Sequence, residues 1–321
     1  MNKYIIYITL TALLLSSCLI EDNAGGSGRS STSSRGNNGV EISFMQGVPP
    51  SLVYVETGSN PDANFEVVIN INNKGFFPRN ELGSLNGRIH LSGFDSNVIR
   101  NGRWDGGNQF NRIQASSEYF PEGGSEQKRF VAPEINYPFD AREYPLDLLA
   151  TACYYYETEA TGIVCIDPNP ASQVDKVCRM GRVSVDPQGA PVIVTGVEQT
   201  GNSRNIFLSL EVANVGSGTV LKEFDGAGVI TEDRCLSTSF GDTDLIGIDA
   251  SIVGIGDGDC RPQGTHDDPV RLYEGRGPVV CTFELPENID SAYTAQMKIT
   301  LQYGYRQTAR KQVTLVNTAA R

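Results

Sequence analysis

The sequence predicts an all-β fold of two tandem β-sandwich domains with an immunoglobulin-like layout. Thirty-four Gly and 16 Pro divide the chain into short segments, as in proteins with many turns. In several of these segments apolar and polar residues alternate, the period of a strand with one face in a core. One such segment recurs 141 residues later, and each copy has room for about seven strands without a long helix.

Residues 1–17 have the features of an export signal. Lys3 provides a short positive region, and the apolar run Ile5 to Leu15 is too short to span a bilayer. Leu15-Ser16-Ser17-Cys18 then matches the lipobox of prokaryotic lipoproteins, in which the Cys sulfur is lipid-modified. The alternative is an ordinary signal peptide followed by a Cys that has no such role.

Residues 18–39 are predicted to be a lipidated Cys followed by a disordered tether rich in Gly and Ser. The predicted partner of this segment is the membrane, reached through the lipid anchor. The formal net charge of the whole chain is −12. Nucleic acid is therefore not expected as a partner, because phosphate binding requires a cationic surface.

The repeat begins with two matching segments, Asn64 to Gly75 and Asn205 to Gly216. Their apolar positions align at period two, and each ends in Asn-x-Gly, which predicts a strand followed by a turn. Pro50 and Pro191 match at the same offset.

A second match, at an offset of 149 residues, lies near the end of each copy. It aligns Tyr144, Tyr154 and Tyr156 with Tyr293, Tyr303 and Tyr305. Each set is predicted to be followed by a turn and a last strand, Gly162 to Ile166 or Lys311 to Val316. Two matches in the same order indicate a duplication, with domain 1 at residues 40–166, a connector at 167–177 and domain 2 at 178–321.

The strand that ends in Asn-x-Gly resembles CARDB-like domains, which are adhesion-type modules of immunoglobulin-like fold in archaeal and bacterial surface proteins. The whole layout is similar to lipid-anchored archaeal surface proteins with tandem domains of this kind. The resemblance implies a fold and a location, and it carries no catalytic residue.

Six cysteines follow the lipobox: Cys153, Cys165, Cys178, Cys235, Cys260 and Cys281. An even number in an exported chain predicts three disulfides, and CxxC pairs or His partners for zinc are absent from the sequence. A hairpin with its turn between Glu157 and Gly162 would bring Cys153 opposite Cys165. Cys235 with Cys260 is then favoured because these two bracket a Gly- and Asp-rich segment, and Cys178 with Cys281 follows by elimination.

One candidate binding loop is Asn101 to Asn111, which contains the only Trp of the chain. Trp104, Phe110 and Arg103 would form a contact surface for a glycan or a protein, because aromatic anchors dominate binding patches. The alternative is that Trp104 folds back against the end of the sandwich.

Three further features have both a functional and a structural interpretation. Asp257, Asp259, Asp267 and Asp268 suit Ca²⁺ by residue type but do not have EF-hand spacing, so a solvated loop is the alternative. His266 beside Asp267 has no accompanying nucleophile motif. The run Tyr154 to Tyr156 has repeat partners and is predicted to be part of the core.

These features predict a non-enzymatic surface lipoprotein on the extracytoplasmic face of the cell membrane. It would act as an adhesion, interaction or structural module that contacts other envelope proteins or itself. The alternative is a ligand- or glycan-binding lipoprotein that uses the loop 101–111. No cofactor is expected, apart from a structural Ca²⁺ at the Asp-rich segment.

Overall fold

The computed structural model describes residues 39–61, 64–79, 85–222, 230–262, 268–287 and 289–319. In these ranges the chain is nearly all strand, with a single short helix, α1 (Glu232–Leu236). The predicted all-β class is therefore confirmed. The signal peptide, Cys18 and the predicted tether up to residue 38 lie outside the described residues.

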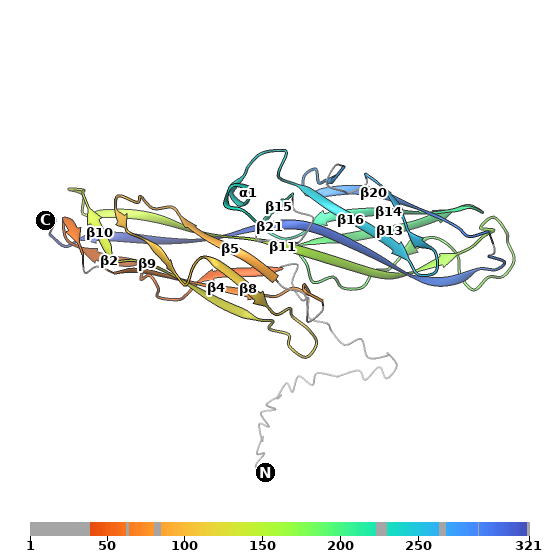
Figure 1. The fold of residues 1–321 in the computed structure, drawn as a ribbon, viewed down its shortest axis with the longest axis horizontal. Coiled ribbons are helices and arrows are strands. Elements are labelled where there is room, and N and C mark those ends of the chain that lie inside the picture. The colour runs from red at the N-terminus through yellow and green to blue at the C-terminus, as the bar shows by residue number, and fades with distance from the viewer. Residues whose placement is uncertain are drawn as a thin grey trace, which may run out of the picture. The chain divides into compact units, whose positions relative to one another are not determined.

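Two antiparallel sheets correspond to one another in the two repeats (Figure 1). The first has the order β1 (Val40–Phe44), β4 (Phe65–Asn73), β9 (Ser125–Ala132) and β7 (Arg103–Asp105). The second has the order β12 (Arg182–Val183), β13 (Val192–Gly201), β14 (Asn205–Asn214), β20 (Arg276–Glu284) and β18 (Asp259–Arg261). β1, β4, β9 and β7 thus correspond in order and pairing to β13, β14, β20 and β18.

A third sheet is built on two long antiparallel strands, β11 (Glu143–Ile166) and β21 (Tyr293–Asn317). β5 (Leu85–Ser92) pairs with β11, and β8 (Gln109–Ile113) pairs with β5. The strands on the β21 side are β15 (Thr219–Leu221), β16 (Leu245–Ile252), β17 (Gly256–Asp257), β19 (Val270–Arg271) and β2 (Leu52–Val55), the last of them parallel to β21. A small separate sheet contains β3 (Gly58–Asn60), β10 (Glu134–Tyr137) and β6 (Ile99–Arg100).

Each of the two long strands contributes one half to the first repeat and the other half to the second, so the repeats exchange strand halves. The first half of β11 pairs with β5, whereas its second half lies beside β13, where Thr158 Oγ1 donates a hydrogen bond of 2.7 Å to the carbonyl of Val192. β21 does the reverse: its first half pairs with β16, and its last residues pair with β2. The predicted ranges 40–166 and 178–321 therefore share one sheet, and each is completed by a strand half from the other.

This exchange contradicts the predicted end of each repeat. β11 runs straight through Glu157 to Gly162, so the expected turn and hairpin are wrong, and Gly162 to Ile166 is no separate strand. β21 likewise runs through Lys311 to Val316 without a turn. Pairing of β11 with β21 over its whole length provides each residue with the backbone partner that a hairpin would have provided.

The matching strands and turns of the repeat are confirmed. Every second residue of β4 and β14 is buried on the core side, from Phe65 to Ile71 and from Ile206 to Val212. Asn73 Oδ1 accepts a hydrogen bond of 3.2 Å from the backbone N–H of Gly75, and Asn214 Oδ1 accepts one of the same length from Gly216. The side chain of each Asn therefore holds the turn after its strand.

The match of Pro50 with Pro191 is wrong. The carbonyl of Pro191 accepts backbone hydrogen bonds from Val215 and Gly216. In the first repeat the carbonyl of Gly39 accepts the corresponding bonds from Lys74 and Gly75. Gly39, the residue before β1, is therefore the structural counterpart of Pro191, the residue before β13.

The second repeat contains an insertion, residues 222–244. β15 and β16 pair with neighbouring parts of β21, at Leu221–Gly304 and Gly247–Gln302, where the first repeat has the single strand β5. The insertion carries α1, which a disulfide between Cys235 and Cys153 joins to β11. The carbonyl of Cys235 also accepts a hydrogen bond of 3.1 Å from Arg306 of β21.

Candidate interaction site

All six described cysteines form disulfides: Cys153–Cys235, Cys165–Cys178 and Cys260–Cys281. Three bonds are thus confirmed, but all three predicted pairings (Cys153–Cys165, Cys235–Cys260 and Cys178–Cys281) are wrong. Cys153 and Cys165 lie 12 residues apart on one straight strand, a separation of about 40 Å at the rise of a β-strand. The disulfides indicate an oxidising, extracytoplasmic environment. Among the described residues, no helix has the length and apolar character needed to cross a membrane.

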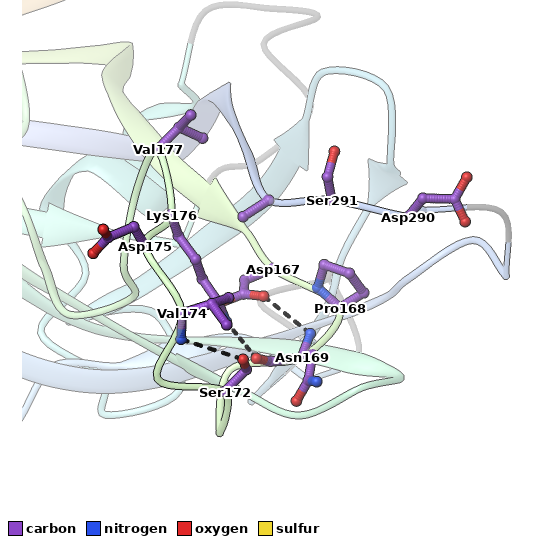
Figure 2. A pocket seen from close by; sticks show the side chains of 11 residues that line it. Asp167, Pro168, Asn169, Ser172, Val174, Asp175, Lys176, Val177, Asp290 and Ser291 are labelled. Carbon is purple, nitrogen blue, oxygen red and sulfur yellow. Dashed lines mark hydrogen bonds and ion pairs between the residues drawn. The ribbon is translucent and has the colours of Figure 1, made fainter.

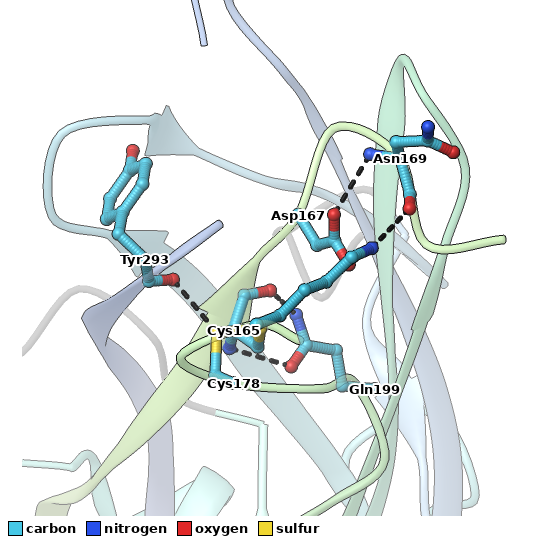
Figure 3. The surroundings of a disulfide bond; sticks show 7 residues. Cys165, Asp167, Asn169, Cys178, Gln199 and Tyr293 are labelled. Atoms are coloured by element: carbon cyan, nitrogen blue, oxygen red, sulfur yellow. Dashed lines mark hydrogen bonds and ion pairs between the residues drawn. A yellow bond between two sulfur atoms is a disulfide. The ribbon is translucent and has the colours of Figure 1, made fainter. Parts of the chain in front are cut away.

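The disulfide between Cys165 and Cys178 closes the segment predicted as a connector, residues 167–177, into a loop (Figure 3). Gln199 of β13 holds the start of this loop. Its side-chain amide accepts a hydrogen bond of 3.0 Å from the N–H of Cys165 and donates one of 2.6 Å to the carbonyl of the same residue. Gln199 is itself buried, so the loop starts from a fixed point of the core.

A buried ion pair holds the loop from inside. Lys176 Nζ lies 2.6 Å from Asp167 Oδ2, and the two side chains are only 7% and 4% exposed. Lys176 also donates to the carbonyl of Asn169, while Asp167 Oδ1 accepts a hydrogen bond of 3.0 Å from the Asn169 N–H. Both charges are therefore paired and hydrogen-bonded, as buried charges require.

A pocket of about 370 Å³ lies between this loop and the chain before β21 (Figure 2). It is lined by Asp167, Pro168, Asn169, Ser172, Val174, Asp175, Lys176, Val177, Asp290, Ser291 and Ala292. Val174 is 65% exposed and Val177 is 78% exposed, although both are apolar. The volume falls within the range of ligand pockets, and we take the pocket with its loop as the candidate interaction site.

The predicted binding loop 101–111 is not assembled as a contact surface. Phe110 is fully buried in the core and is therefore excluded from any contact. Trp104 is half-buried on β7, and its ring packs edge-on against Phe130 at 5.5 Å between centroids. Trp104 thus packs back onto the sandwich, which was the alternative reading, and of the three predicted residues only Arg103 is exposed.

Of the four Asp residues considered for Ca²⁺, the three that the structure describes (Asp257, Asp259 and Asp268) do not gather as a group of metal ligands. Asp257 lies on β17 and Asp259 on β18, which belong to different sheets, and Asp259 forms an ion pair of 3.0 Å with Arg261. Asp268 is exposed, and Asp267 and His266 lie outside the described residues. In the part of the chain that the structure describes, no three His, Cys, Asp or Glu side chains gather as metal ligands.

The predicted core role of the tyrosine run is confirmed, together with its repeat partners. Tyr154, Tyr156, Tyr303 and Tyr305 are all buried, with neighbouring ring centroids 5.9 to 6.3 Å apart. The hydroxyl of Tyr154 accepts a hydrogen bond from the N–H of Val40, and that of Tyr303 accepts one from Val192, the first residue of β13. Burial raises the pKa of all four phenols, that of Tyr305 to about 12.

No protein-family model and no curated protein matches this chain. Sequence reasoning missed the pocket because it treated residues 167–177 as a linker. The signal that points to it is the position of Cys165 and Cys178, which stand at the two ends of that segment.

Proposed function

We propose that this protein is a non-enzymatic lipoprotein of the cell surface, anchored through Cys18, which acts as an adhesion, interaction or structural module of the envelope. The observation that carries this proposal is the cross-linked loop 167–177. Its disulfide and its buried ion pair fix the backbone, and it exposes apolar side chains beside a pocket.

A fixed loop suits binding better than a mobile one. Ordering a loop at an interface costs free energy that reduces affinity, and a cross-link removes most of this cost in advance. The three disulfides support a location outside the cytoplasm, and the lipobox at Leu15 to Cys18 supports an anchor there. The described domain would then present its loop to other molecules of the envelope.

Cross-linking mass spectrometry on intact cells tests the interaction role. Links from the loop 167–177 to one foreign envelope protein are expected for an adaptor or adhesion module, and regular links between copies of this chain are expected for a structural assembly. Cross-links confined within single copies would contradict both roles.

Membrane fractionation tests the anchor separately. The wild-type chain should be found in the membrane fraction, whereas the variant Cys18→Ser should be lost from it. An equal distribution of the two proteins would contradict the lipid anchor and leave the interaction role to be judged by the cross-links.

A further inference from the structure

The charges at the pocket beside the loop 167–177 do not balance. Asp167 and Lys176 neutralise one another inside the loop. Asp175 and Asp290 are exposed, and neither forms an ion pair with any described residue. Figure 2 shows these two carboxylates on opposite sides of the pocket. Arg179 lies near the loop, but its guanidinium donates to the carbonyl of Val174 and is not part of the lining.

Apolar surface lies between the two carboxylates. Pro168, Val174, Val177 and Ala292 line the pocket together with the aliphatic stem of Lys176, whose ammonium group faces inward to Asp167 and Asn169. A bound segment would therefore meet apolar side chains between two negative charges, together with the polar residues Asn169, Ser172 and Ser291 of the lining. Contacts of this kind combine burial of apolar area with charge complementarity at the rim.

We infer that an extended basic segment of a partner protein binds across this pocket, with an apolar side chain at its centre and cationic side chains directed to Asp175 and Asp290. This inference rests on the proposed role as an interaction module. In an extended segment, alternate side chains point the same way, so an apolar residue with a cationic residue two positions before it and another two positions after it would direct all three side chains to the pocket. The net charge of −12 of the chain would add long-range attraction for such a partner.

The arrangement fits a basic segment better than a metal ion. A calcium site takes six to eight oxygen ligands around one point, and the two free carboxylates lie on opposite sides of the pocket (Figure 2). The third carboxylate of the lining, Asp167, already binds Lys176.

The inference is tested by NMR titration of the isotope-labelled full chain with the peptide acetyl-Lys-Ser-Val-Ser-Lys-amide, in which Val and both Lys share one face of the extended backbone. We expect saturable shifts confined to the backbone amides of residues 167–178 and 290–293. The same peptide with Glu in place of Lys should cause none of these shifts. The double variant Asp175→Asn/Asp290→Asn should weaken binding about threefold to tenfold, the effect of losing two exposed ion pairs.

A matched control removes two exposed carboxylates elsewhere, in the variant Asp257→Asn/Glu118→Gln. It should bind the peptide like the wild-type chain. Equal weakening in both double variants would show attraction to the overall charge only and would overturn the inference. So would the same shifts on addition of CaCl₂ alone, or no saturable shift with the Lys peptide. None of these outcomes bears on the cross-linking test of the proposed function, so the two can fail independently.

Discussion

Tyr155 of β11 pairs in register with Gly304 of β21, and the residues on both sides repeat about this pair. Tyr154 lies opposite Tyr305, and Tyr156 lies opposite Tyr303. Since the duplication relates Tyr154 to Tyr303 and Tyr156 to Tyr305, the pair marks the centre of an approximate twofold relation between the repeats. This relation explains why the strand halves are exchanged in both directions.

Neither repeat should fold alone. A chain of residues 39–166 lacks the part of β21 that pairs with Glu143 to Ala152, and a chain of residues 178–319 lacks the part of β11 that pairs with Tyr293 to Gln302. We expect poor dispersion of amide NMR signals for each piece and a native spectrum when both are co-expressed. A sharp cooperative unfolding transition of either piece alone would contradict the exchange.

Peptide mapping under non-reducing conditions should find Cys153–Cys235, Cys165–Cys178 and Cys260–Cys281. The bonds close loops of very different length, with sequence separations of 82, 13 and 21 residues. Replacing both cysteines by Ser should therefore destabilise the fold most for Cys153–Cys235, by about 4.5 kcal/mol, and by roughly 3 kcal/mol for the other two pairs. Urea unfolding gives the free energy of unfolding of each double variant. An equal loss for all three would contradict the expected order.

The variant Lys176→Met should lower the free energy of unfolding by about 3–5 kcal/mol, because it leaves the carboxylate of Asp167 buried without its cation. The double variant Lys176→Met/Asp167→Leu should recover most of this loss, since no buried charge remains. Urea unfolding of the wild-type chain, both single variants and the double variant gives the coupling free energy. Additive effects of the two single changes would show that the ion pair does not hold the loop.

The four buried tyrosines should ionise late in an alkaline spectrophotometric titration. Because their pKa values are raised in the folded state, the stability they contribute is complete below pH 10. It is lost as the pH rises through the folded values, with Tyr305 at about 12. The variant Tyr154→Phe/Tyr303→Phe should reduce the amplitude of the late phase only. A single phase near pH 10 would contradict the buried cluster.

His90 should make the fold less stable in mild acid. Burial lowers its pKa below the ordinary value of 6.5, and nearby Arg88 acts in the same direction, while Glu232, 3.8 Å from Nδ1, opposes both. Because the unfolded chain binds this proton more readily, stability is complete above pH 6.5 and falls as the pH drops toward the folded pKa, by at most about 1.4 kcal/mol per pH unit. His90→Leu should remove this slope between pH 6.5 and 5. An unchanged slope in His90→Leu would contradict the assignment.

The strands could be predicted from local sequence patterns, but the exchange of strand halves between β11 and β21 depends on residues that lie far apart in the sequence. Alternation from Phe65 to Ile71 and the Asn-x-Gly turns follow from side chains that lie within a few residues of one another, so they could be read from sequence. Glu157 to Gly162 is polar and contains a Gly, which suggested a turn, but these residues find backbone partners in β21 more than 130 residues away. The predicted Cys153–Cys165 disulfide depended on that turn, and it failed with it.

The candidate site could not be predicted from the sequence, for a related reason. The segment 167–177 has the composition of a linker, with two Pro and several polar residues, and composition alone does not show that a disulfide closes it. Its buried Lys176 also has the residue type that is most often exposed. In contrast, the buried tyrosines could be predicted because the duplication gave each of them a partner.

The exchange of strand halves also determines when this chain can fold as it is made. Residues 157–166 of β11 must wait for residues 293–302, and residues 143–152 must wait for 307–316. Neither repeat has all its strands until most of β21, the last described strand, has been synthesised. The fold therefore has a high contact order and a slow final assembly. A protein built in this way remains loosely structured through most of its synthesis, the state in which a chain can be threaded across a membrane before it locks into shape outside.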